Sequence, residues 1–144
     1  MTSNRTRTDL LTREQFRKRV FARDGGRCVL CGEAAVDPHH VMERKLFADG
    51  VYYLDNGASV CGRCHLLCET TEIPVEDVRR AAGITEPVMP PGYLPDRAYD
   101  KWGNRIHPDG TRTWGPLKGD EGMLKAIGAR RWAIFRNDDP VGTA

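Results

Sequence analysis

Four of the five cysteines form two Cys-x-x-Cys pairs, Cys28 with Cys31 and Cys61 with Cys64. Each pair can present two thiolates to one metal ion at the zinc–sulfur distance of ~2.3 Å, and two pairs complete a tetrahedron. This spacing is specific for zinc sites, so we expect a structural Zn²⁺ on the four cysteines. Buried thiols are one alternative, and a redox dithiol protein is a weaker one because the chain lacks a βαβ pattern. We expect Cys68, four residues after Cys64, to be a core residue or a free thiol and not a substitute ligand.

Three of the four histidines and one asparagine gather around the cysteine pairs. His39, His40 and Asn56 lie between the pairs, and His65 directly follows the second pair. Adjacent residues of a strand point to opposite faces, so one of the two neighbouring histidines can hold a metal while the other stays free for a proton. A neutral imidazole with a pKa near ~6.5 is a suitable base near neutral pH. A zinc module needs only the cysteines, so the additional residues favour an enzyme.

Three motifs stand close together in this part of the chain. They are Cys28-x-x-Cys31, then Asp37-Pro38-His39-His40-Val41, then Asn56 followed five positions later by Cys61-Gly-Arg-Cys64-His65. With this set, the stretch from about Phe16 to Thr71 resembles the HNH endonuclease family, a branch of the ββα-metal or His-Me finger nucleases. The resemblance implies an α+β fold with a zinc-stapled ββα core: a hairpin with the first histidine, an asparagine in its loop and a helix with the last histidine.

The resemblance also implies a role for each of these polar residues. His40 would be the general base that activates water, and His39 and His65 would bind a catalytic divalent ion. Asn56 would orient the base or help to bind the metal. The implied activity is that of a metal-dependent endonuclease, which hydrolyses phosphodiester bonds in nucleic acid, with DNA favoured over RNA.

Two metal ions with separate tasks follow from the chemistry. Phosphodiester cleavage needs an activated water, stabilisation of a more negative transition state and help for the leaving oxygen. A closed site with four cysteine ligands has no open position, so the structural zinc cannot serve the reaction. The catalytic ion has few protein ligands, which leaves its identity open among Mg²⁺, Mn²⁺, Ni²⁺ and Zn²⁺.

Positive charge is concentrated at the N-terminal end of the chain. The formal net charge of the whole chain is +2, whereas its first 31 residues hold eight Lys and Arg against three Asp and Glu. A solvated helix face is the alternative, but beside a nuclease motif these cations suggest a surface that meets phosphates. The cations that we expect to contact nucleic acid are Arg17, Lys18, Arg23, Arg27, Arg44, Lys45 and Arg63.

The elements that position these residues are predicted from caps and periodicity. The segment from Thr12 to Gln15 matches a capping box and predicts a helix over about 13–23. Phe16, Val20 and Phe21 are expected on one face of that helix. The other predicted elements are strands over 39–41 and 57–60, and helices from 61 or 62 to 69 and from 74 to 82.

We divide the chain into a flexible basic arm (1–11), a nuclease domain with the zinc site (12–85) and a C-terminal extension of unknown role (86–144). In the extension, Pro108-Asp109-Gly110 predicts a hairpin turn with His107 as a turn residue, and a helix is expected within 121–135. The aromatic residues expected to form a satellite core there are Tyr93, Tyr99, Trp102, Trp114 and Trp132.

Composition limits the remaining classes. Of the 144 residues, 40% are hydrophobic and 29% are charged, so the core is thin and a staple such as zinc is expected. No apolar run approaches the ~20 residues of a membrane span, and the N-terminus lacks the apolar stretch of a signal peptide. We therefore expect a cytoplasmic protein with no membrane partner. A non-catalytic zinc module that binds nucleic acid or protein is the alternative function, and both a monomer and a homodimer stay open.

Overall fold

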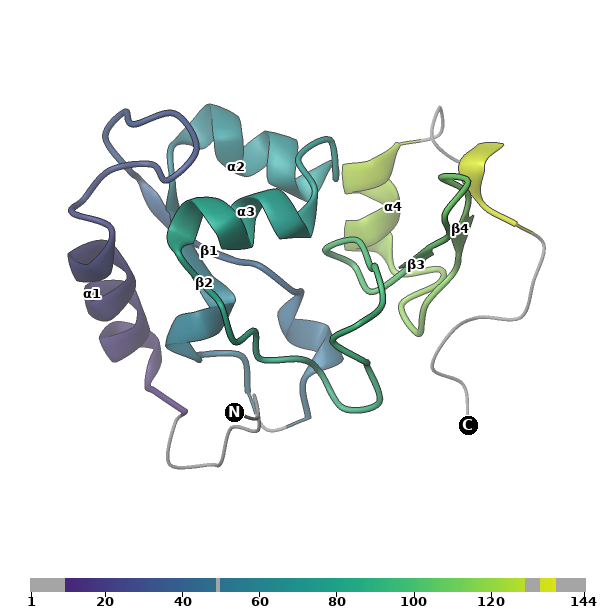
Figure 1. The fold of residues 1–144 in the computed structure, drawn as a ribbon, viewed down its shortest axis with the longest axis horizontal. Coiled ribbons are helices and arrows are strands. Elements are labelled where there is room, and N and C mark those ends of the chain that lie inside the picture. Colours follow the sequence, from purple (N-terminus) through teal and green to yellow (C-terminus); the bar gives the residue numbers. More distant parts are fainter. Residues whose placement is uncertain (1–9, 49, 129–132, 137–144) are drawn as a thin grey trace.

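The computed structural model describes residues 10–48, 50–128 and 133–136, and they form an α+β fold (Figure 1). The expected arm, residues 1–11, falls almost entirely outside the described residues. Along the longest axis, α1 lies at one end, α4 and the small sheet β3–β4 at the other, and the hairpin β1–β2 in between. In chain order the elements are α1 (Arg13–Arg23), β1 (Asp37–His40), η2 (Arg44–Leu46), η3 (Leu54–Asn56), β2 (Gly57–Val60), α2 (Gly62–Glu69), α3 (Val75–Ala82), β3 (Arg105–Ile106), β4 (Arg112–Thr113) and α4 (Glu121–Ile127).

The predicted first helix and its capping box are confirmed in α1. The Oγ1 atom of Thr12 accepts from the backbone N–H of Gln15 at 3.1 Å, and the backbone N–H of Thr12 donates to the Gln15 side chain at 2.9 Å. Phe16 and Val20 are buried, as expected. Phe21 was expected on the same face but is only half-buried, because consecutive helical residues lie about 100° apart around the axis.

The hairpin β1–β2 is antiparallel and places His39 opposite Ala58 and His40 opposite Gly57. The second strand matches its prediction, whereas the first begins two residues earlier than expected, at Asp37, and ends at His40. Gly57 lets α1 approach the hairpin closely: a Cβ atom there would lie 2.6 Å from the side chain of Val20. Helix α1 therefore packs directly on β2, the strand that pairs with the two histidines of β1.

Helix α2 follows β2 after one residue and packs on the hairpin, which completes a ββα unit. Its N-cap is Cys61, whose Sγ atom accepts from the backbone N–H of Cys64 at 3.4 Å. Helix α3 follows with Pro74 as its N-cap, and Gly83 ends it in the left-handed region at φ 74°. Both helices agree with the predicted boundaries to within one residue.

The main core joins the two halves of the chain. Cys68 is 1% exposed in this core, which confirms the interpretation of Cys68 as a core residue. Tyr93 and Tyr99 belong to the same core, so their assignment to a satellite cluster was wrong. The segment that carries them packs on residues of the hairpin and α3, which removes apolar surface of both from water. A second cluster does form around Trp102 with Trp114, Met123 and Ile127, and the expected Trp132 lies outside the described residues.

The C-terminal hairpin β3–β4 turns at the predicted place. The backbone N–H of His107 donates to the carbonyl of Thr111 at 2.8 Å, and the left-handed residue of the turn is Gly110, at φ 87°. Helix α4 is capped by Asp120 and ends at Gly128, so it occupies only the first half of the range predicted for it. Within the described ranges, none of the helices is long and apolar enough to cross a membrane.

Candidate catalytic cleft and metal sites

The four paired cysteines lie together, as predicted. The Sγ atoms of Cys28, Cys31, Cys61 and Cys64 all lie within 4.8 Å of one another, and those of Cys31 and Cys61 are 3.6 Å apart. Ligands at ~2.3 Å from a tetrahedral ion lie about 3.8 Å from one another. This cluster could therefore hold a metal such as zinc.

Local structure brings the two pairs together. The first pair sits in a tight turn in which the N–H of Cys28 donates to the carbonyl of Glu33 at 2.7 Å. The N–H of Val29 in this turn donates to the carbonyl of Ser59 in β2 at 2.9 Å, which ties the turn to the strand that leads into the second pair. The pairs thus meet where β2 ends and α2 begins.

The pKa values of the clustered cysteines are shifted in opposite directions. Burial raises the pKa of Cys28, but nearby backbone N–H groups outweigh this effect and lower the pKa to about 7. Burial raises the pKa of Cys64, and the adjacent thiols raise it further. Four thiolates in one place repel each other, and a bound cation is what allows them to ionise together.

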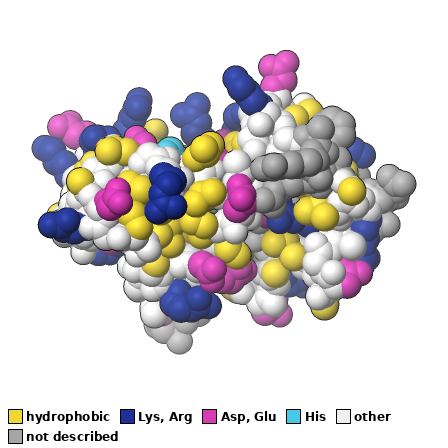
Figure 2. Space-filling model, turned by 90° about the horizontal axis from the view of Figure 1, so that it is seen from above, with side chains coloured by type: hydrophobic (Ala, Val, Ile, Leu, Met, Phe, Trp, Pro, Cys, Tyr) yellow, Lys and Arg dark blue, Asp and Glu magenta, His cyan; other side chains and the backbone are white. Residues whose placement is uncertain are grey.

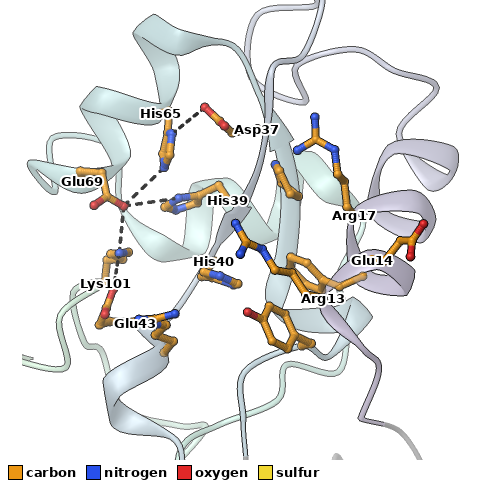
Figure 3. A pocket seen from close by; sticks show the side chains of 14 residues that line it. Arg13, Glu14, Arg17, Asp37, His39, His40, Glu43, His65, Glu69 and Lys101 are labelled. Atoms are coloured by element: carbon orange, nitrogen blue, oxygen red, sulfur yellow. Dashed lines mark hydrogen bonds and ion pairs between the residues drawn. The ribbon is translucent and has the colours of Figure 1, made fainter.

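A cleft of about 670 Å³ opens beside the hairpin (Figure 3). It contains all three histidines that the sequence singled out, His39, His40 and His65. The elements that form it are α1 on one side, α2 on the other, and the hairpin between them. The side chains that line it are those of Arg13, Glu14, Phe16, Arg17, Asp37, Pro38, His39, His40, Glu43, Arg44, Tyr52, His65, Glu69 and Lys101.

His39, His65 and Glu69 form a second group of potential metal ligands. Their donor atoms lie within 4.8 Å of one another, and Oε2 of Glu69 is 3.6 Å from both Nδ1 of His39 and Nε2 of His65. Ligands about 2.1 Å from an ion lie roughly 3–3.5 Å apart, so a small inward movement would complete the site. His39 is buried, and among the described residues its Nδ1 atom has no hydrogen-bond partner. These three side chains could hold a divalent ion.

Asp37 holds His65 in a defined orientation. Its Oδ2 atom lies 3.1 Å from Nδ1 of His65, which leaves the Nε2 atom directed toward Glu69. A carboxylate behind a histidine is a common support for metal ligands because it sets the tautomer and the ring orientation. Contact with Glu69 raises the pKa of His65, and Asp37 adds to the effect. Burial raises the pKa of Glu69, but His65 and Lys101 outweigh it and hold that pKa at about 2, so Glu69 is ionised.

His40 follows His39 on β1 and occupies a different environment. Its ring stacks on Phe16, with centroids 5.1 Å apart and planes inclined by 26°, and lies 5.7 Å from the ring of Tyr52. Burial lowers the pKa of His40 to about 4, and the charge of Lys101 contributes. The imidazole is therefore neutral near pH 7, and its Nδ1 atom has no hydrogen-bond partner in the described part of the chain. His40 can accept a proton and is not one of the clustered ligands.

Asn56 is fully buried and holds the segment after β1. Its Oδ1 atom accepts from the N–H of Met42 at 3.0 Å, and its Nδ2 atom donates to the carbonyl of Met42 at 3.1 Å. Met42 lies two residues after His40, so these bonds fix the backbone that leaves the histidine pair. Of the two roles inferred for Asn56, these contacts favour positioning, since its amide is already used and lies outside the cleft lining.

The cations predicted to meet nucleic acid occupy three kinds of place. Arg17 and Arg44 line the cleft, together with Arg13, which the prediction did not include. Lys18 and Arg63 are exposed on α1 and α2, outside the cleft, and Lys18 forms a surface ion pair with Glu14 at 3.4 Å. Figure 2 shows Lys and Arg side chains on several sides of a histidine that reaches the surface.

The remaining three predicted cations are engaged in intramolecular contacts. Arg23 donates to the carbonyl of Gly57 at 2.7 Å and pairs with Asp24, so its guanidinium faces the hairpin. Arg27 donates to the carbonyl of Gly32 at 3.2 Å within the first cysteine turn. Lys45 pairs with Asp120 at 2.9 Å.

Sequence reasoning missed several cleft residues. Glu69 lies four residues after His65 on one helix, and Asp37 lies two residues before His39 on one strand, so periodicity could have placed both beside the predicted ligands. No comparable signal existed for Lys101, which enters the cleft from the C-terminal extension.

Comparison of the chain with family models, with curated proteins and with solved structures finds no match.

Proposed function

We propose that this protein is a metal-dependent endonuclease of the HNH type, which hydrolyses phosphodiester bonds in nucleic acid, with DNA as the favoured substrate. One observation carries the proposal: a single cleft contains a neutral histidine, His40, next to the three potential metal ligands His39, His65 and Glu69. A base and a metal site in adjacent positions are the two parts that phosphodiester hydrolysis requires.

The two groups of ligands have different tasks in this proposal. Cys28, Cys31, Cys61 and Cys64 would hold a structural zinc ion that ties the first turn to α2. His39, His65 and Glu69 would hold the catalytic ion, whose positive charge would stabilise the transition state and the leaving oxygen. Its identity among Mg²⁺, Mn²⁺, Ni²⁺ and Zn²⁺ is a question for metal titration.

Side chains in the cleft and the buried Asn56 behind it have the remaining roles. His40 accepts the proton of the attacking water, and the packing of Phe16 and Tyr52 on its ring limits ring rotation. Asn56 fixes the backbone that follows the histidine pair. Because the His40 ring is already held in place, no conformational entropy has to be lost to position the base during the reaction.

Substrate enters along a positively charged side of the cleft. Arg13 and Arg17 of α1 face the histidines across the opening (Figure 3), and Arg44 also lines the cleft. Arginine guanidinium groups bind phosphate oxygens with two parallel hydrogen bonds, which fixes the backbone of a nucleic acid without selecting its sequence.

The test is cleavage of a supercoiled plasmid by the purified protein in the presence of Mg²⁺, Mn²⁺ or Ni²⁺. Wild type should produce nicked or linear plasmid, and His40→Ala should be slower by a factor of ~10²–10⁴, the usual contribution of a general base. His107→Ala is a matched control because His107 lies in the β3–β4 turn, outside the cleft. Equal rates in wild type and His40→Ala would place the base elsewhere or identify a contaminant. If wild type cuts no DNA or RNA with any ion, the non-catalytic zinc module becomes the better hypothesis.

A further inference from the structure

A loop of the C-terminal extension is attached to the two segments that bring Glu43 and Glu69 to the cleft. The N–H of Glu43 donates to the carbonyl of Lys101 at 3.0 Å, and Nε1 of Trp102 donates to the carbonyl of Glu69 at 2.8 Å. The loop itself is held by the buried Asp100, which accepts from the N–H of Trp102 and pairs with Arg112 at 2.7 Å. The backbone of Lys101 is therefore fixed by hydrogen bonds on both sides, and its side chain extends into the cleft.

The ammonium group of Lys101 is almost completely enclosed. Its Nζ atom lies 2.8 Å from Oε1 of Glu43 and 2.8 Å from Oε2 of Glu69, and the side chain is only 6% exposed. The ring of Trp102 covers it, with Nζ 4.1 Å from the centroid. A desolvated cation between two carboxylates interacts with its surroundings far more strongly than a surface lysine does.

One carboxylate oxygen connects Lys101 with the metal ligands. Oε2 of Glu69, which Lys101 contacts, is the atom that lies 3.6 Å from Nδ1 of His39 and 3.6 Å from Nε2 of His65. A divalent ion among these three ligands would share this oxygen with the ammonium group (Figure 3). Two positive groups that share one oxygen repel each other.

Formal charges give the direction of the effect. Glu43, Lys101 and Glu69 together carry one net negative charge, whereas the two carboxylates without the lysine would carry two. More negative charge beside the ligands favours a divalent cation, and less negative charge disfavours it.

We propose that Lys101 is a positioning residue that holds the carboxylates of Glu43 and Glu69 and limits the affinity of the His39–His65–Glu69 site for divalent ions. The inference rests on the proposed function in one respect only, namely that these three residues bind metal. It gives the C-terminal extension a specific task, which is to supply an internal cation to a site built by the first half of the chain.

Substitutions of the two partners separate this role from a purely structural one. Lys101→Met makes the site more negative, Glu43→Gln makes it less negative, and the double variant restores the wild-type net charge. If Lys101 only supported the fold, the loss of either contact would weaken metal binding, whichever partner was replaced. Lys118→Met is the matched control, because Lys118 is exposed and lies outside the cleft.

The experiment is a titration of the zinc-loaded protein with Mn²⁺ in the absence of nucleic acid, with free Mn²⁺ measured by electron paramagnetic resonance. His65→Ala identifies the part of the binding that belongs to this site. Lys101→Met should bind Mn²⁺ ~10-fold more tightly or better, and Glu43→Gln should bind it more weakly by a similar factor. The double variant and Lys118→Met should stay close to wild type.

The possible outcomes separate the two proposals. Weaker binding in both single variants, or no change in Glu43→Gln, overturns the role of Lys101. If Lys101→Met does not fold, Glu43→Gln still decides, because unchanged or tighter binding contradicts the charge argument. If neither wild type nor any variant shows Mn²⁺ binding that His65→Ala abolishes, there is no metal site and both proposals fail. If the Mn²⁺ affinities follow the expected order but the wild-type protein cleaves no plasmid, the nuclease proposal is refuted and the role of Lys101 is retained.

Discussion

The two groups of potential metal ligands have different surroundings, although α2 or its N-cap contributes to both. The cysteine group consists of four like ligands, three of them buried, in a turn and at a helix start. The histidine group has three ligands in an open cleft, with Lys101, Asp37 and Glu43 around it. Four ligands complete a tetrahedron and leave no position for substrate, whereas three ligands leave the ion open.

Under the proposed function, the number of ligands and their surroundings, and not their proximity along the chain, separate the structural site from the reactive one. Cys64 and His65 are neighbours in α2, yet their side chains belong to different groups. Consecutive residues of a helix point about 100° apart, so one helix can serve two sites on different faces. Substitutions in the two groups should accordingly have separate effects on stability and on activity.

The largest expected effect is the loss of the cysteine site. Cys61→Ser should abolish zinc binding and unfold the protein, since a structural zinc contributes ~10–16 kcal/mol of apparent binding free energy and a domain has only ~5–15 kcal/mol of stability. Serine can still cap α2, so the substitution isolates the loss of the ligand. Elemental analysis and thermal unfolding measure both effects.

Cys68→Ala is the matched control for this prediction. Cys68 is buried but lies outside the ligand group, so the variant should retain about one zinc per chain and lose only ~1–2 kcal/mol of unfolding free energy. Wild-type protein purified without chelator that contains less than about half an equivalent of zinc would contradict the structural zinc.

The second effect separates two histidines of the same cleft. At low metal concentration, the cleavage rates of His65→Ala and His40→Ala should both be ~10²–10⁴-fold lower than that of wild type. Excess Mn²⁺ should partly restore His65→Ala, because two ligands remain, but should not restore His40→Ala, which lacks the base. A metal titration of plasmid cleavage measures this, with zinc content expected to be unchanged in both variants. Equal rescue of the two would remove the distinction between ligand and base.

A smaller effect should follow from substitution of Asp37, whose carboxylate orients His65. Asp37→Asn leaves the ligands in place but weakens the orientation of the ring, so we expect a ~10–100-fold loss of Mn²⁺ affinity in direct titration. Zinc content and thermal stability should stay close to wild type, since the Asp37 side chain is 46% exposed. Asp96→Asn is the control, because Asp96 is exposed and lies outside the cleft. If the two variants bind Mn²⁺ equally well, Asp37 has no role at the site.

The smallest effects compare two parts of α1. Charge reversal of Arg17 and Lys18 to Glu should weaken nucleic-acid binding at every sequence and flatten its salt dependence, without a change in fold. Arg23→Gln should instead lower the free energy of unfolding by ~1–3 kcal/mol, because it removes the bonds to Gly57 and Asp24. Filter binding at several salt concentrations and urea unfolding distinguish the two. Unchanged binding after the double reversal would make the exposed face a solubilising surface only.

Much of the ββα unit was predictable from the sequence because its signals are local. The cysteine spacing, the capping box at Thr12, the strand over 57–60 and the glycine stop at Gly83 each depend on residues within one turn or one strand. The side chain of Glu69 was also within reach of such reasoning, since its distance from His65 along α2 is four residues.

The features that the sequence did not reveal all depend on contacts between distant segments. Arg23 looked like a phosphate-binding cation but is held by the backbone of the hairpin. Tyr93 and Tyr99 looked like parts of a separate cluster but share the main core. In each case the side chain has several suitable partners, and the packing of the whole chain selects one.

The sequence by itself determined the cysteine pairs, the order of the elements and the set of histidines, because spacing along a turn, strand or helix dictates these. The tertiary structure decided which two histidines join Glu69, which predicted cations line the cleft, and that Lys101 enters the cleft from 36 residues beyond His65. The physical reason is that a contact between segments far apart in sequence has no period along the chain. It arises only when burial of the common core brings those segments together.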